Sequence, residues 1–250
     1  MAQMNFLCIS SYNNDLEWVK NYPNPHIIYD KVWNGGVVDN DNSGTLPPSN
    51  LKEKYPEYNI VNGSPNGYNI SDYMTFIVDH YDNLPDVTAF IKGNIVGRHV
   101  SQKVFDKVIN NKTFTPIEDW EMHDQTQLSL RNGYAMMSCD GGWMETNDSW
   151  YLNHPKHPTK YFRSYNDFLK FCFKNPVLPK YVRFPTGGNF VVPKEYILKY
   201  DKIFYENLKK FTDHARVSGE GQMIERALFT IWMCNFEVND TMRDWSNDNH

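Results

Sequence analysis

The sequence predicts an α/β fold in which a mixed, mostly parallel sheet is flanked by helices. Short, almost continuous apolar runs recur through the first half of the chain, and segments of helical periodicity separate them. Continuous apolar runs are typical of strands buried on both faces, and strand–helix alternation is typical of parallel sheets. The chain has 250 residues, of which 40% are hydrophobic and 15% aromatic, so it can bury a sizeable core.

The first half contains the clearest elements. Strands are expected over residues 5–12, 26–31, 58–62 and 86–94. Helices are expected over residues 13–22, 69–83 and 99–111, where apolar side chains recur every three or four positions. Asn69 or Ser71 can cap the second helix, because a short polar side chain accepts a hydrogen bond from the first turn. Residues 33–68 are rich in Gly, Pro, Asn and Ser, which predicts a long loop around the third strand.

The second half is expected to be irregular at first. Residues 112–160 are crowded with Trp, Met, Gly and His and show no clear period. Order returns with a Ser-capped helix over 164–173, and then with two strands joined by a double-glycine turn and a helix that begins near Pro193. A strong amphipathic helix is expected over 219–235, and residues 236–250 are expected to form a loose acidic tail.

Charge and composition exclude several classes of protein. The formal net charge is −5, whereas a nucleic-acid binder normally carries a basic excess. No apolar run is long enough to cross a bilayer, and the first residues lack the pattern of a signal peptide. The four cysteines form no CxxC pair, which favours buried free thiols in a reducing compartment. We therefore expect a cytoplasmic protein, in the host cytoplasm if the source is viral, with no nucleic-acid partner and no membrane span.

Parallel sheets bind ligands beyond the carboxyl ends of their strands. The segments that follow the predicted strands are therefore the candidates for a site, namely residues 10–14, 30–31, 62–66 and 92–98.

Several segments resemble known proteins. "SYNNDLEWV" (11–19), "IIYDK" (27–31), "NGYNISDYMTFIVDHYDNLPDVTAFIKG" (66–93) and "GGNFVVPKEYIL" (187–198) are similar to domain-of-unknown-function family 3431, over most of residues 5–235. "CISSYNNDLEWV" (8–19) resembles the first strand and helix of nucleotide-sugar glycosyltransferases of the A type. Gly67-Tyr68-Asn69 departs from the "GRE" that family members often have, so no role of that Arg-Glu pair is carried over.

The resemblance implies a Rossmann-like sandwich of the glycosyltransferase A type. It implies a single domain over residues 1–235, with a nucleotide-binding half at about 1–111 and an acceptor half at about 112–235. The implied partners are a nucleotide-sugar donor, with UDP-sugar favoured, and a glycan or glycoprotein acceptor. The alternatives are a non-catalytic module of the same fold that binds nucleotide-sugar or carbohydrate, and a metal-dependent hydrolase built on the histidines.

The end of the strand over 86–94 differs from the usual pattern of A-type enzymes. Many of them place an Asp-x-Asp pair there, which holds Mn²⁺ or Mg²⁺ on the donor diphosphate. This chain has Lys92-Gly93-Asn94, and Arg98 follows shortly afterwards. Basic side chains neutralise phosphate directly, so we expect a metal-independent site built on Lys92 with Arg98 and Arg226. Mn²⁺ or Mg²⁺ remains the alternative, with Asp39 and Asp41 as its candidate ligands in a segment that otherwise suits a surface turn.

The remaining candidates are assigned by role. The expected donor-binding residues are Ser10, Tyr12, Asn13, Asp15, Lys92, Gly93, Asn94 and Arg98. Glu220, bracketed by two glycines at a helix start, is expected to take the proton of the acceptor hydroxyl, with Glu225 as the second candidate. A helix-start charge is the plainer interpretation of Glu220. The expected acceptor-binding residues are Trp143, Trp150, Gly187, Gly188 and Asn189, although a simple tight hairpin explains the glycines equally well.

Overall fold

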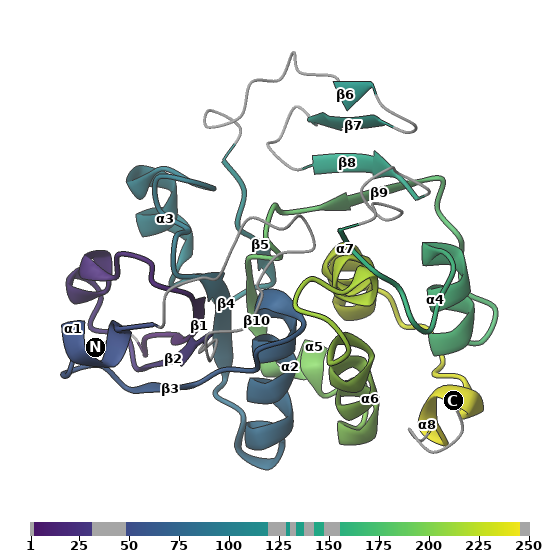
Figure 1. Cartoon of the computed structure of the whole chain (residues 1–250), viewed down its shortest axis with the longest axis horizontal. Helices are drawn as coiled ribbons and strands as arrows, with labels where there is room; N and C mark the ends of the chain where they lie inside the picture. Colours follow the sequence, from purple (N-terminus) through teal and green to yellow (C-terminus); the bar gives the residue numbers. More distant parts are fainter. Residues whose placement is uncertain are drawn as a thin grey trace.

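The described part of the chain forms two sheets, with helices packed around the larger one (Figure 1). The computed structural model describes residues 3–31, 49–119, 129–130, 134–137, 143–147 and 156–245. The larger sheet has six strands in the order β3-β2-β1-β4-β10-β5. Its strands are β1 (Phe6–Ser11), β2 (His26–Asp30), β3 (Ile60–Asn62), β4 (Val87–Lys92), β5 (Thr115–Pro116) and β10 (Phe190–Pro193). The predicted α/β class with a mostly parallel sheet is confirmed.

The strand order places a switch point between β1 and β4. The chain adds β2 and β3 on one side of β1 and then crosses to place β4 on the other side. All four strands run parallel, and β10 and β5 then pair in antiparallel fashion. Ser10 pairs with both Tyr29 and Lys92 in the register of the sheet, so β1, β2 and β4 end at one edge. In an open α/β sheet, ligands bind beyond the carboxyl ends of the strands at such a switch point.

Successive residues of the central strands face two separate cores. On one side, side chains such as Cys8 and Phe90 pack against α2 (Tyr68–His80), α6 (Lys202–Thr212) and α7 (Gly219–Met233). On the other side, Ile9, Ile91 and their neighbours pack against η1 (Glu17–Asn21), α1 (Leu51–Lys54) and α3 (Gln102–Val108). This alternation follows from the two-residue period of a strand and explains why the strands have almost continuous apolar sequences.

The smaller sheet is antiparallel and lies beside α7, toward the top of Figure 1. Its strands, in sheet order, are β6 (Ser129–Leu130), β7 (Tyr134–Met137), β8 (Trp143–Thr146) and β9 (Tyr181–Phe184). The expectation that residues 112–160 are irregular is therefore wrong at β5, β6, β7 and β8. The remaining elements are η2 (Tyr81–Asn83), α4 (Tyr165–Cys172), α5 (Lys194–Ile197) and α8 (Asp240–Arg243).

Three local predictions are wrong for identifiable reasons. Residues 17–21 form a 3-10 helix instead of an α-helix over 13–22, and Asn13 has a left-handed φ of 47°. Helix α2 begins after Gly67, whose φ is 73° and which has no side-chain cap, so Asn69 and Ser71 lie within the helix. Strands β9 and β10 belong to different sheets, so the double glycine between them connects two sheets and does not form a hairpin.

No helix in the described part of the chain is long and apolar enough to cross a membrane.

The expected loose tail is a packed segment up to residue 245. Val238 forms an isolated bridge with Phe173, and Met242 in α8 is fully buried. The Trp245 ring lies 4.7 Å from that of Phe211 and 5.5 Å from that of Tyr161, measured between ring centroids. The sequence did not predict this packing because the apolar residues of the C-terminal segment are few and widely spaced.

The Trp245→Ala variant tests this packing. Because the indole is buried among aromatic rings, its removal is expected to lower the free energy of unfolding by about 3–5 kcal/mol. Urea unfolding measures the change, and Asp244→Ala, at the exposed neighbouring position, is the control. Equal stability of the Trp245→Ala variant and the unmodified chain would show that the segment contributes nothing to the core.

Candidate functional site

A polar pocket opens where β1, β2 and β4 end. We call it the carboxyl-edge pocket, and its volume is about 220 Å³. It is lined by Ser10, Ser11, Tyr12, Asn14, Lys31, Tyr68, Asn69, Lys92, Asn94, Arg98 and Arg216. Four of these side chains are basic, and none of the described lining residues is Asp or Glu. An excess of positive charge in a concave site attracts anions.

One lining residue of this pocket, Lys31, belongs to a buried ion pair. Lys31 follows β2, and its ammonium lies 3.0 Å from Oδ1 of Asp72 in α2, with the two side chains only 4% and 0% exposed. The Ser10 hydroxyl, at the end of β1, donates to Oδ2 of Asp72 at 2.5 Å. The Lys31 ammonium also donates to the carbonyls of Ser64 and Asn66, at 2.8 and 3.3 Å. Lys31 therefore uses its three N–H donors within the protein.

The charges of this pair are set by two opposing effects. Burial lowers the pKa of Lys31 and raises the pKa of Asp72, because removal from water disfavours both charged forms. The attraction between the two groups opposes both shifts. Asp72 balances Lys31, so the other basic residues of the lining are Lys92, Arg98 and Arg216.

Lys92 is held at the pocket by its backbone and by an aromatic ring. Its amide donates to Oδ1 of Asn189 at 3.0 Å. Its ammonium lies 4.6 Å from the centroid of the Tyr68 ring, which is a cation–π contact. The left-handed Gly187 lies against the Lys92 stem, where an added Cβ would be 2.7 Å from Cδ. Glycine at 187 thus leaves room for the lysine.

Glycine 93 is required by close packing at the end of β4. A Cβ at this position would lie 2.6 Å from the Ser11 hydroxyl and 2.9 Å from Oδ1 of Asn14. The carbonyl of Gly93 accepts a 2.8 Å hydrogen bond from the Trp18 indole. Asn94 and the exposed Arg98 then line the pocket beyond it. Among the predicted donor-binding residues, Gly93 is thus a backbone support, whereas Asn94 and Arg98 face the pocket.

The other predicted donor-binding residues divide between the pocket and its surroundings. Ser10 and Tyr12 line it, and partial burial raises the pKa of the Tyr12 hydroxyl while the charge of Arg216 lowers it. Asn13 and Asp15 are exposed and do not belong to its lining. Oδ1 of Asp15 accepts instead from the Tyr55 hydroxyl at 2.7 Å. The sequence alone could not show that Tyr12 lines the pocket while Asn13 and Asp15 do not, because this difference depends on the sharp turn of the chain at Asn13.

Glu220 clamps a neighbouring segment and does not line the carboxyl-edge pocket. Its side chain is fully buried, and Oε1 accepts from the amides of Lys160 and Tyr161 at 2.8 and 2.7 Å. Oε2 lies 2.6 Å from Nε2 of His214. Burial raises the pKa of Glu220, but these hydrogen bonds outweigh burial and bring it below its ordinary value.

The glycines beside Glu220 also have a packing role. The Gly219 amide donates to the carbonyl of Pro158 at 2.8 Å, and a Cβ on Gly219 would lie 2.3 Å from the Thr159 side chain. The sequence suggested a flexible loop around a catalytic carboxylate. The structure instead has a tight contact between the start of α7 and residues 157–162.

Glu225 lies closer to the pocket wall than Glu220 does. Its Oε1 accepts from the Gly187 amide at 3.2 Å, and Asn69, which lines the pocket, donates to the carbonyl of the same glycine at 2.9 Å. Burial raises the pKa of Glu225, while the charges of Arg226 and Lys92 lower it. A buried carboxylate with a raised pKa has the character of a general base.

The predicted acceptor residues are only partly brought together. Gly187 and Gly188 form the left-handed turn beside Lys92, with φ values of 79° and 63°. Asn189 is fully buried, and its side chain bonds the Lys92 amide and the Thr186 carbonyl, so it supports the turn. Trp143 lies in β8, and its side chain, like the whole of Trp150, lies outside what the structure describes.

Arg226 does not line the carboxyl-edge pocket. The guanidinium of Arg226 forms a buried two-point pair with Glu145, with N–O distances of 2.8 and 3.0 Å. Asp39 and Asp41 lie outside the described residues. Within the described ranges, no three His, Cys, Asp or Glu side chains are grouped as metal ligands would be.

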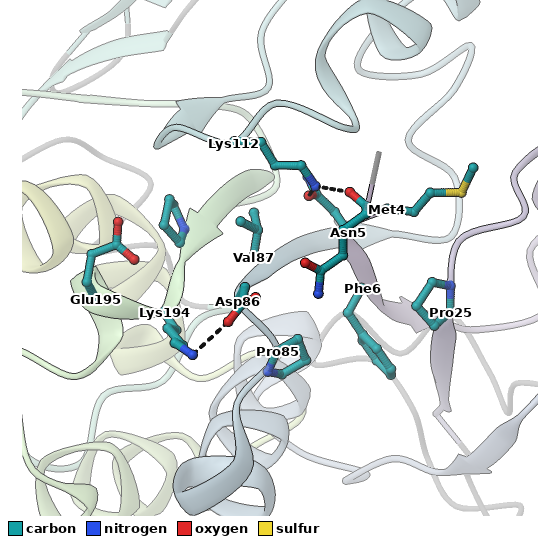
Figure 2. A pocket seen from close by; sticks show the side chains of 12 residues that line it. Met4, Asn5, Phe6, Pro25, Pro85, Asp86, Val87, Lys112, Lys194 and Glu195 are labelled. Carbon is teal, nitrogen blue, oxygen red and sulfur yellow. Dashed lines mark hydrogen bonds and ion pairs between the residues drawn. The ribbon is translucent and has the colours of Figure 1, made fainter. Parts of the chain in front are cut away.

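A larger pocket, of about 430 Å³, opens at the opposite edge of the sheet (Figure 2). It lies at the amino ends of β1 and β4. Lys194 bonds Asp86 at 2.7 Å, and Lys112 donates to Oδ1 of Asn5 at 2.6 Å. Because it lies at the amino ends of the strands, it is the weaker candidate despite its size.

The clamp role of Glu220 predicts a pH-dependent loss of stability in Glu220→Gln. The variant is expected to be about 3 kcal/mol less stable at pH 6, because charge-assisted hydrogen bonds are lost. The folded pKa lies below the ordinary value of 4.5, so this contribution is present above that value and is lost as pH falls through the folded pKa. The stability difference from the unmodified chain should therefore shrink on acidification.

Urea unfolding at several pH values between about 3 and 6 measures this effect. The exposed Glu195→Gln is the control. A difference that stays constant with pH, or a variant as stable as the unmodified chain, would contradict the clamp role.

Comparison with known proteins identifies a family but no activity. No curated protein and no solved structure matches the chain. A family profile described as "Protein of unknown function (DUF3431)" matches residues 8–244, which include every residue of the carboxyl-edge pocket. The chain therefore belongs to this family.

Proposed function

We propose that this chain transfers a sugar from a nucleotide-sugar donor to a glycan or glycoprotein acceptor. The favoured donor is a UDP-sugar, and the proposed fold is of the glycosyltransferase A type. The observation that carries the proposal is the carboxyl-edge pocket. It lies at the switch point of the parallel strands and is lined by basic side chains with no described carboxylate among them. Nucleotide phosphates bind at this place in open α/β sheets.

The charge of the pocket favours direct binding of the diphosphate without a metal ion. A bridging Mn²⁺ or Mg²⁺ needs carboxylate ligands, whereas the described lining supplies Lys92, Arg98 and Arg216. Basic groups form short, charge-assisted hydrogen bonds to phosphate oxygens. We therefore assign the neutralisation of the diphosphate to these three side chains.

The same side chains suit the chemistry of transfer. The acceptor hydroxyl forms a bond to the anomeric carbon, the bond from that carbon to the diphosphate breaks, and the diphosphate leaves with an added negative charge. Fixed cations stabilise this developing charge. The hydroxyl proton passes to a base, and we assign that role to Glu225, because it borders the pocket wall through Gly187. Glu220 is the weaker candidate, since both of its oxygens are engaged.

A second candidate function is binding without transfer. The observation that favours it is the lack of a carboxylate in the described lining, together with the hydrogen bond that Glu225 accepts from the Gly187 amide. Such a module would bind a nucleotide-sugar in the same pocket and leave it intact.

Donor binding without metal is the first test of the proposal. Thermal shift against UDP- and GDP-sugars in EDTA is expected to show stabilisation by at least one UDP-sugar. The Arg98→Gln variant should weaken that binding about tenfold, because one charge-assisted contact to phosphate is lost. Lys103→Gln is the matched control, since it removes an equal charge from an exposed position in α3. Binding that requires Mn²⁺, or equal losses in the two variants, would contradict a metal-independent site.

An assay for release of the nucleotide diphosphate distinguishes a transferase from a module that only binds the donor. In the presence of the donor that binds, the unmodified chain is expected to release UDP. Glu225→Gln should slow the release about a hundredfold if Glu225 is the base, with donor affinity nearly unchanged. Binding without any release would favour the module, and normal release by Glu225→Gln would eliminate that residue as the base.

A further inference from the structure

Tyr68 has an unusual backbone conformation for a large residue. It is the first residue of α2 and has a φ of 52°, directly after Gly67 at 73°. Left-handed φ values bring Cβ close to the following carbonyl and cost free energy in residues other than glycine. Such outliers persist where the surrounding structure holds them, and they concentrate at functional sites.

Two hydrogen bonds hold the chain in this conformation. The amides of Gly67 and Tyr68 donate to the carbonyls of Ala215 and Arg216, at 2.9 and 3.0 Å. Gly67 is packed so closely that an added Cβ would lie 2.4 Å from the Thr212 hydroxyl. The turn therefore joins the start of α2 to the segment that follows α6, and this requirement explains the glycine at 67. Both backbone bonds would be equally available to a glycine at 68, so they do not explain the tyrosine.

The Tyr68 side chain connects the parts of the carboxyl-edge pocket that carry charge. Tyr68, Lys92 and Arg216 all line the pocket, although they come from three distant parts of the sequence. The Lys92 ammonium lies 4.6 Å from the centroid of the Tyr68 ring, within the range of a cation–π contact. The backbone of Tyr68 bonds that of Arg216. A glycine at 68 would keep the second contact and lose the first.

We propose that Tyr68 is a positioning residue whose ring holds the Lys92 ammonium at the place where it receives a phosphate group. The left-handed conformation is retained because it directs the ring to the lysine. A flexible lysine loses rotamer freedom when it binds an anion, and a lysine already restrained by a ring loses less. This inference rests on the anion-binding role proposed above for the carboxyl-edge pocket and assigns the orientation of its lysine to one side chain.

Two variants separate the ring from the backbone. Tyr68→Phe keeps the ring and the strain, whereas Tyr68→Gly removes the ring and relieves the strain. Acetylation of Lys92, which proceeds through the deprotonated amine and is read out by mass spectrometry, reports how freely that amine reacts without any ligand. Lys92 is expected to react about fivefold faster in Tyr68→Gly than in the unmodified chain, and at an unchanged rate in Tyr68→Phe. Lys103 and Lys194 serve as internal references.

Calorimetry with inorganic pyrophosphate in EDTA gives the second measurement. Tyr68→Gly should bind pyrophosphate about fivefold to tenfold more weakly, Tyr68→Phe should bind like the unmodified chain, and urea unfolding should find Tyr68→Gly at least as stable. Equal Lys92 acetylation in all three proteins, or equal losses in both variants, would overturn the inference. If the unmodified chain binds neither pyrophosphate nor any nucleotide-sugar, the proposed function fails, whereas the acetylation rates still decide whether Tyr68 holds Lys92.

Discussion

The buried pair of Lys31 and Asp72 is the interaction on which the carboxyl-edge pocket depends. It joins the end of β2 to α2, and the Ser10 hydroxyl extends it to the end of β1. Removing two charges from water is unfavourable, and breaking such a pair is more so, because it leaves one charge buried alone. The pair therefore fixes three elements at the switch point of the sheet. With its own charges balanced, it leaves the character of the pocket to Lys92, Arg98 and Arg216.

Those three side chains reach the pocket by different means. Lys92 extends from the end of β4, with its backbone bonded to Asn189 and its ammonium against the Tyr68 ring. Arg98 is an exposed residue in the segment between β4 and α3, and Arg216 lies in the segment between α6 and α7. The Gly187 turn closes the wall next to Lys92 and brings Glu225 close to it. Asp72 is buried against Lys31 and Glu225 accepts from a backbone amide, and none of the described lining residues is acidic.

The sequence predicted the parts of this site that depend on local patterns. Apolar runs located β1 to β4, and the polar residues directly after them identified the edge at which Ser10, Tyr12, Lys92 and Asn94 meet. Lys92-Gly93-Asn94 further predicted that the pocket has basic side chains in place of an Asp-x-Asp pair. The described lining is basic.

The sequence failed where distant contacts decide the structure. Trp18 bonds the Gly93 carbonyl and Leu16 bonds the Tyr55 hydroxyl, and these contacts replace the expected helix over 13–22 by a short 3-10 helix. Arg216 had no local signal, because only the fold of α6 against α2 brings it to the pocket. Glu220 had a strong local signal, between two glycines at a helix start, yet those glycines serve a close contact that no local pattern reveals.

The central claim is that fixed side-chain cations at the carboxyl edge of the sheet receive a diphosphate without a bridging ion. The most direct measurement is a crystal structure of the chain with UDP or a UDP-sugar, grown in EDTA and again with Mn²⁺. We predict that the phosphate oxygens lie at about 3 Å from Lys92, Arg98 and Arg216, in the same place under both conditions. A nucleotide bound elsewhere, or one whose phosphates contact a Mn²⁺ ion held by carboxylates, would contradict the account.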